Sequence, residues 1–128
     1  MTPLTREWVG KAEGDLHSCL RESRARKNPN YDSACFHAQQ CVEKYLKARL
    51  QEVGAAVPKT HNLEELMNRL LPFEPHWAGL RPDLVRLGNY AVVFRYPGLS
   101  ASKADAQKAR TACRRVRKVV RASFGLKN

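Results

Sequence analysis

The feature that most constrains this fold is the helical spacing of apolar residues along the chain's last segment. From Ala109 to Phe124 the apolar side chains stand mostly three or four residues apart. Side chains at this spacing share one face of an α-helix. Residues 5–26 and 31–53 show the same period, and the β-prone run at 92–94 is too short to indicate a strand. The chain is therefore expected to be all-α.

Helix caps and breakers place the ends of these helices. We predict four main helices, over residues 5–26, 31–53, 81–93 and 103–124. A short helix is expected to start near Asn62, with Thr60 as its cap, and the link at 71–77 is expected to be irregular because it holds two prolines. Long helices joined by short loops each bury one apolar stripe of side chains against the other helices. This arrangement predicts an up-and-down bundle of four main helices with the short helix added.

Length and charge limit the classes of function. Residues 1–128 fit a single helical domain with one core. No apolar run approaches the roughly 18 residues that a membrane span needs, and the first residues lack the layout of a secretion signal, so a cytoplasmic protein is expected. Lys and Arg total 23 against 12 acids, a net charge of +11. This excess favours nucleic acid, nucleotide phosphate or an acidic protein as a partner, although a merely soluble basic protein has the same composition.

The four cysteines do not form a metal-binding pattern. Cys19, Cys35, Cys41 and Cys113 include no Cys-x-x-Cys pair, and each lies within a helical pattern. Zinc ligands usually stand on turns at tighter spacing. We expect small, buried, reduced core residues, and no metal or cofactor.

A row of polar side chains follows one side of the predicted second helix. His37, Gln40, Lys44 and Lys47 stand three or four residues apart and so line one helix face. A solvated face normally carries Glu, Lys and Arg, whereas this row suits hydrogen bonding to a neighbouring helix, a second subunit, or the phosphate or base of a ligand. In the alternative reading, His37 is a partly buried structural residue, Gln40 bridges two helices, and Glu43 and Lys44 make local ion pairs.

Arg95 closes the predicted fourth helix and is the first candidate for binding an anion. It precedes Tyr96-Pro97, so its side chain can fold back into the bundle, and its planar guanidinium suits phosphate or carboxylate. The alternative is a structural salt bridge to an acid such as Glu43. Tyr96 can stack a base or cap the core. His61 is interpreted as a capping element of the short helix, or as part of an anion site there.

The predicted last helix is strongly basic. Eight Lys or Arg side chains stand there against a single acid, Asp105. They form either a solvated face or an RNA-binding face, and in the second case the affinity should fall steeply with salt as counterions are released. No aromatic residue is interleaved on that face, so base stacking is not predicted there.

Four motifs, in order, resemble those of HEPN domains (higher eukaryotes and prokaryotes nucleotide-binding). Residues 36–47, Phe-His-Ala-Gln-Gln-Cys-Val-Glu-Lys-Tyr-Leu-Lys, resemble the signature of the family's second helix. Residues 8–16 resemble the family's opening helix, and Thr-His-Asn-Leu at 60–63 resembles the start of its third helix. Arg-Tyr-Pro at 95–97 resembles the end of its penultimate helix. The resemblance extends from about residue 8 to residue 120.

The resemblance implies a helical bundle, often dimeric and commonly partnered by a small nucleotidyltransferase as a toxin–antitoxin pair. It also implies either a nucleotide-binding subunit or an RNA-cleaving toxin. Catalytic members carry an Arg and a His separated by four to six residues, which act on RNA at a dimer cleft. Arg95 stands where that Arg is expected, but no His follows it. A formal match at Arg69 and His76 lies upstream, in a proline-containing loop.

We therefore predict a nucleotide- or RNA-binding helical subunit, a homodimer that acts with a nucleotidyltransferase. The alternatives are a metal-independent endoribonuclease toxin that uses Arg95 with His37, and a non-catalytic dimeric interaction module. The predicted nucleotide- or phosphate-binding residues are Arg95, His37, Gln40, Lys44, Lys47 and Tyr96.

Overall fold

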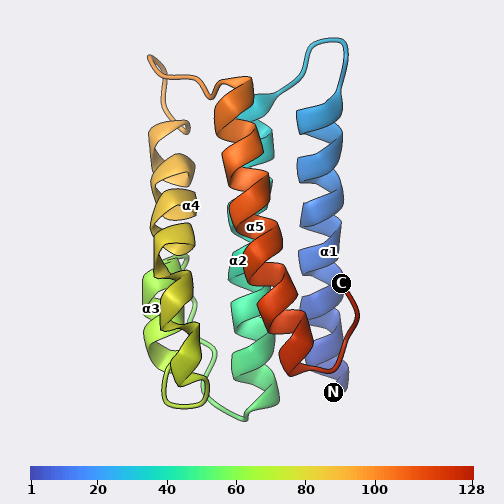
Figure 1. The fold of residues 1–128 in the computed structure, drawn as a ribbon, viewed down its shortest axis with the longest axis vertical. Helices are drawn as coiled ribbons and strands as arrows, with labels where there is room; N and C mark the ends of the chain where they lie inside the picture. Colours follow the sequence, from blue (N-terminus) through green and yellow to red (C-terminus); the bar gives the residue numbers. More distant parts are fainter.

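A computed structural model describes all 128 residues as an all-helical up-and-down bundle, which confirms the predicted fold class. Helix α2 lies behind α5, with α1 and α4 on either side and α3 beside α4 (Figure 1). None of the helices combines the length and the apolar character that crossing a lipid bilayer requires. The elements are α1 (Pro3–Arg24), α2 (Tyr31–Glu52), α3 (Leu63–Leu70), the 3-10 helix η1 (Pro75–Leu80), α4 (Arg81–Val93) and α5 (Lys103–Ser123).

Side-chain caps fix where most helices begin. Thr2 caps α1, Asn30 caps α2, and Ser102 forms a capping box with Asp105 at the start of α5. These caps satisfy backbone N–H groups that lack partners in the first turn. Helix α4 has no side-chain cap and begins with proline in its first turn, as predicted.

Two predictions around α3 are wrong. Its cap is Asn62, whose side chain accepts a hydrogen bond from the backbone N–H of Glu65. Thr60 instead accepts from the N–H of Asn62, one step outside the helix. Nor does His61 cap the helix, because its ring reaches a carboxylate of α2.

The link before α4 is more regular than predicted. Residues 75–80 form η1, although 71–77 was expected to be irregular. Pro75 stands in the first turn, where its missing N–H costs nothing, and the buried Trp77 and Leu80 anchor the short helix to the core. A proline at this position thus starts a turn of helix rather than breaking one.

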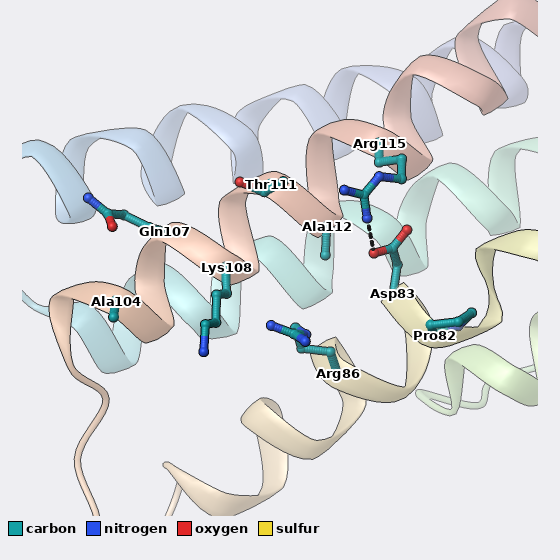
Figure 2. A pocket seen from close by; sticks show the side chains of 9 residues that line it. All are labelled: Pro82, Asp83, Arg86, Ala104, Gln107, Lys108, Thr111, Ala112 and Arg115. Carbon is teal, nitrogen blue, oxygen red and sulfur yellow. Dashed lines mark hydrogen bonds and ion pairs between the residues drawn. The ribbon is translucent and has the colours of Figure 1, made fainter.

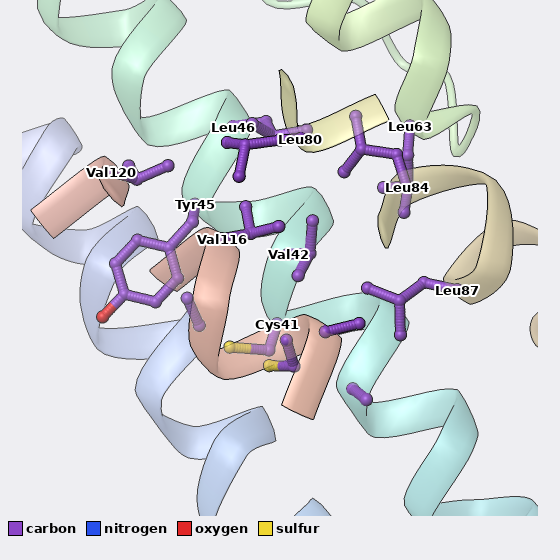
Figure 3. Close-up of a cluster of buried hydrophobic side chains, with 14 of the residues drawn as sticks. Cys41, Val42, Tyr45, Leu46, Leu63, Leu80, Leu84, Leu87, Val116 and Val120 are labelled. Carbon is purple, nitrogen blue, oxygen red and sulfur yellow. The ribbon is translucent and has the colours of Figure 1, made fainter. Parts of the chain in front are cut away.

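The core is one cluster of 27 buried residues, and α2 contributes the largest share of it. Figure 3 shows Val42 and Tyr45 of α2 among Val116 and Val120 of α5, with Leu87 of α4 nearby. Each fully buried aliphatic side chain of this size contributes about 1.5–3 kcal/mol to folding. Helix α2 is therefore the central helix of the bundle.

All four cysteines are free and buried, as predicted. Burial raises the pKa of the Cys19 and Cys35 thiols to about 12. The pKa of Cys41 is also raised, first by a hydrogen bond with Cys113 and then by burial. The thiols of Cys19, Cys35 and Cys41 are therefore protonated at neutral pH, and all four buried cysteines pack as small apolar groups.

Candidate functional site

Two members of the predicted polar row on α2 are bonded to one acid of α1. His37 Nδ1 lies 2.9 Å from Asp15 Oδ1, and Lys44 Nζ donates to Asp15 Oδ2. The carboxylate of Asp15 is 11% exposed, whereas the two side chains bound to it are about a quarter exposed. Asp15 thus joins α1 to α2 by a charge-assisted bridge.

The other two members of the row lead to a second, more deeply buried acid, Glu43. Lys47 Nζ donates to Glu43 Oε2 at 3.2 Å, and both side chains are less than one-tenth exposed. His61 Nδ1 lies 3.1 Å from Glu43 Oε1, and the Gln39 amide donates to the same oxygen. Gln40 Nε2 donates in turn to Gln39 Oε1 at 2.8 Å.

The predicted row therefore does not open onto one shared cleft. His37 and Lys44 bond to Asp15, and Lys47 bonds to Glu43. The alternative of local ion pairs is right for Glu43, which pairs with Lys47 one turn on, whereas Lys44 pairs with the distant Asp15. The alternative reading of His37 as a structural residue agrees with these contacts, whereas Gln40 bonds only to Gln39 and does not bridge two helices. His37 and Lys44 therefore join α2 to α1, whereas the bonds of Gln40 and Lys47 stay within α2.

Arg95 lies apart from that row. Its side chain is exposed and makes no ion pair, so the alternative of a salt bridge to Glu43 is wrong. It lines a cavity of about 410 Å³ together with Asp32, Phe36 and Tyr90, at the end of the bundle where α2 begins. No histidine lines this cavity. Tyr96 is 64% exposed beside it, so it does not cap the core.

A third acid, Glu13 of α1, engages two of the eight cations of α5. Arg117 donates Nε–H and Nη2–H to its two carboxylate oxygens at 2.8 and 2.6 Å, and the Tyr45 hydroxyl donates at 2.7 Å. Arg121 donates to the Tyr45 oxygen and to the backbone carbonyl of Lys127. The Arg117 hydrogen bonds lower the pKa of Glu13 to about 2. This network joins α1, α2, α5 and the C-terminal segment.

The α5 cations that remain point to the surface. Arg115 Nη1 donates to the buried Asp83 of α4 at 2.6 Å. The other five have no acidic partner: Lys103, Lys108, Arg110, Arg114 and Lys118. Because their charges are not neutralised within the chain, they are free to attract an anion.

Accessible donors gather between α4 and α5. There Arg86 of α4 and Lys108 of α5 point into a cavity of about 420 Å³ (Figure 2). Gln107 and Thr111 also line this cavity, and Arg115 lies at one end of it, bonded to Asp83. Asp83 is the one acid in the lining, and its pairing leaves Arg86 and Lys108 uncompensated. We call this cavity the α4–α5 groove.

Sequence reasoning did not find this groove, because its residues come from two helices. Arg86 was not a candidate, although it is a lone exposed cation within an otherwise largely apolar helix. On α5, residues 104, 108, 111 and 115 stand three or four apart and share one face. That spacing is the signal in the sequence, because it separates Lys108 and Arg115 from the other cations of α5.

Comparison with known proteins gives a single match. No curated protein and no solved structure matches the chain. A family model described as the HEPN domain matches residues 5–123. Since this span covers nearly the whole helical bundle, the protein belongs to the HEPN domain family.

Proposed function

We propose that this protein is an RNA-binding helical subunit that holds phosphates in the α4–α5 groove. HEPN domains are generally related to nucleotides and RNA. The observation that carries the proposal is the pair Arg86 and Lys108, two exposed cations that face one groove without an acid to neutralise them. Such side chains bind phosphate and release its counterions.

The neutral polar residues of the groove suit the same ligand. Gln107 and Thr111 offer an amide and a hydroxyl beside the two cations. Phosphate contacts give affinity, while neutral side chains can bond to sugar hydroxyls. Arg95 and Tyr96 belong to the proposal as a second contact, in which Arg95 binds a phosphate and the exposed Tyr96 ring stacks on a terminal or unpaired base.

The proposed assembly follows from the family and from an unpaired apolar stripe. We propose that the chain acts in the cytoplasm with a small nucleotidyltransferase, as in a toxin–antitoxin pair, and that it forms a homodimer. Support for the dimer is the outward face of α4, where Val85, Val92 and Val93 are 39–61% exposed. Exposed apolar stripes of this kind favour protein contacts. Val92→Glu is expected to shift the dimer to a monomer in sedimentation velocity.

Binding of a labelled RNA, followed by fluorescence anisotropy in EDTA, tests the proposal. We expect wild-type affinity to fall steeply as salt rises from about 50 to 200 mM. The double variant Arg86→Ala/Lys108→Ala removes two phosphate contacts, so it should weaken binding about tenfold and reduce the salt slope by about two.

A matched double variant controls for net charge. Lys11→Ala/Lys59→Ala removes two exposed cations that lie on α1 and on the loop before α3. It should leave RNA affinity close to that of the wild type. Equal losses in both double variants would show a general effect of charge and would contradict binding in the α4–α5 groove.

A further inference from the structure

Helix α5 carries unpaired cations on two sides, one toward α4 and one toward α1, which we call its flanks. The α4–α5 groove includes only the flank toward α4. With 3.6 residues per turn, Lys108 and Arg115 lie toward α4, whereas Arg110 and Arg114 lie toward α1. Arg114 lines a separate cavity of about 450 Å³ that includes Leu16 of α1. The positive surface therefore continues across α5 to its other side.

Helix α1 adds cations to this second flank. Arg21 and Arg24 are exposed and line a further cavity of about 400 Å³ on α1. Burial raises the pKa of Cys19, and the charges of Arg110, Arg114 and Arg24 act against that rise. Arg114 and Arg24 thus line two cavities on the α1 side of α5, which extends the positive surface onto this flank.

The crest of α5, between the two flanks, is polar and has no aromatic residue. Gln107, Thr111 and Lys118 are exposed there, and they point away from the core residues Ala109, Ala112 and Val116. The acids that reach α5 from α4 and α1 are already bonded to arginines. The crest and its flanks thus present a broad cationic ridge with small hydrogen-bonding groups along its top.

We propose that this ridge binds double-stranded RNA, with the α5 crest along the minor groove and the phosphates of the two strands on its two flanks. This inference rests on the proposed RNA binding and names the form of RNA. Double-stranded RNA has a wide, shallow minor groove that displays 2′-hydroxyls, and proteins recognise it by contacts to those hydroxyls and to phosphates. Gln107 and Thr111 meet the hydroxyls, while Arg86 and Lys108 face one strand and Arg110 and Arg114 the other.

The same geometry disfavours two other nucleic acids. Single-strand binders pair a cationic groove with aromatic side chains that stack on the bases, and α5 has no aromatic residue. The minor groove of B-form DNA is about 6 Å wide, narrower than a helix of about 10–12 Å. Its major groove is about 8.5 Å deep, whereas α5 has α1 and α4 on either side and cannot enter as a separate helix (Figure 1).

The experiment compares three labelled probes of one sequence in EDTA: an RNA duplex of about 16 base pairs, one of its single strands, and the DNA duplex. The wild type should bind the RNA duplex at least about tenfold more tightly than either of the others. Arg86→Ala/Lys108→Ala and Arg110→Ala/Arg114→Ala alter one flank each, and each should weaken duplex binding about tenfold and lower the salt slope by about two.

Circular dichroism establishes whether each variant is folded. If Arg110→Ala/Arg114→Ala does not fold, Arg110→Gln/Arg114→Gln is used in its place. Lys11→Ala/Lys59→Ala again serves as the charge-matched control and should bind as the wild type does. The inference would be overturned if Arg110→Ala/Arg114→Ala bound the RNA duplex as tightly as the wild type does. It would also be overturned if the wild type bound the single strand or the DNA duplex as tightly as the RNA duplex. In those cases RNA binding through the α4–α5 groove still stands, whereas binding to no RNA probe would contradict the proposed function itself.

Discussion

The charges packed around α2 and the unpaired charges on α5 are used in opposite ways. Asp15 of α1 and Glu43 of α2 are nearly buried, and each is bonded to a lysine and to a histidine. On the ridge of α5, five cations have no acid within the chain. The difference teaches that a polar residue's type and spacing do not reveal its role, because the role depends on whether another helix brings it a partner.

This comparison separates residues that hold the fold from residues that are available to a ligand. A charge that is buried with its partner is costly to uncover, so its loss should appear in the free energy of unfolding. An exposed, unpaired charge contributes little to that free energy. Its loss should appear in binding instead.

Lys47→Met should have the largest effect on stability. It leaves the Glu43 carboxylate, which is 4% exposed, without the lysine that neutralises it. Loss of one partner from a buried ion pair costs about 3 kcal/mol or more. Urea unfolding measures this loss, with the exposed Lys11→Met as control, while RNA affinity should not change. Lower RNA affinity at unchanged stability would instead place Lys47 in the binding surface.

Glu13→Gln should cost about 2 kcal/mol at neutral pH, because Arg117 and Arg121 lose their carboxylate. The pKa of Glu13 is lowered from 4.5 to about 2 in the folded protein. Its contribution is therefore complete above about pH 4.5 and is lost as the pH falls toward 2. Urea unfolding across this window should show wild type and variant converging. A constant difference down to pH 2 would contradict the assignment, and Glu7→Gln on the same helix is the control.

His37→Ala should cost about 1 kcal/mol, a smaller loss because Asp15 keeps its bond to Lys44. Thermal unfolding measures it. RNA affinity in the anisotropy assay should stay within a factor of about two, since His37 lies against Asp15 rather than in the α4–α5 groove. A large drop in affinity without a drop in stability would restore the interpretation of His37 as a ligand contact.

Arg95→Ala should have the smallest effect on stability, within about 0.5 kcal/mol, because the side chain is exposed and unpaired. It should weaken RNA binding a few-fold. Incubation of RNA with wild type and variant in EDTA should leave the RNA intact in both, since no histidine lines the Arg95 cavity. Cleavage by the wild type and not by the variant would support the endoribonuclease alternative.

The sequence predicted the helices well because their signals are local. Pro82 and the Tyr96-Pro97 turn bound α4, and Ser102 starts α5, so the predicted bounds of these two helices differ by at most one residue. Helix α1 begins and ends two residues earlier than predicted, because its cap is Thr2. The short 3-10 helix at Pro75 was missed, because it depends on Trp77 and Leu80 finding the core. Periodicity shows that a residue faces inward, but it does not show what it meets there.

The site was harder to predict because its partners are distant in the sequence. Asp15 lies 22 residues from His37, and Glu13 lies 104 residues from Arg117. Spacing within one helix could not show which cations these acids neutralise. Arg86 and Lys108 came together only when the bundle brought α4 against α5.

The four buried cysteines provide the chain with its own reporters of opening. They stand on α1, α2 and α5, and α3 and α4 have none. A thiol that is shielded and protonated reacts with a maleimide only after its helix separates from the bundle. Labelling rates of Cys19, Cys35, Cys41 and Cys113, read by mass spectrometry, would therefore show whether the three long helices come apart together or one at a time, without any engineered probe.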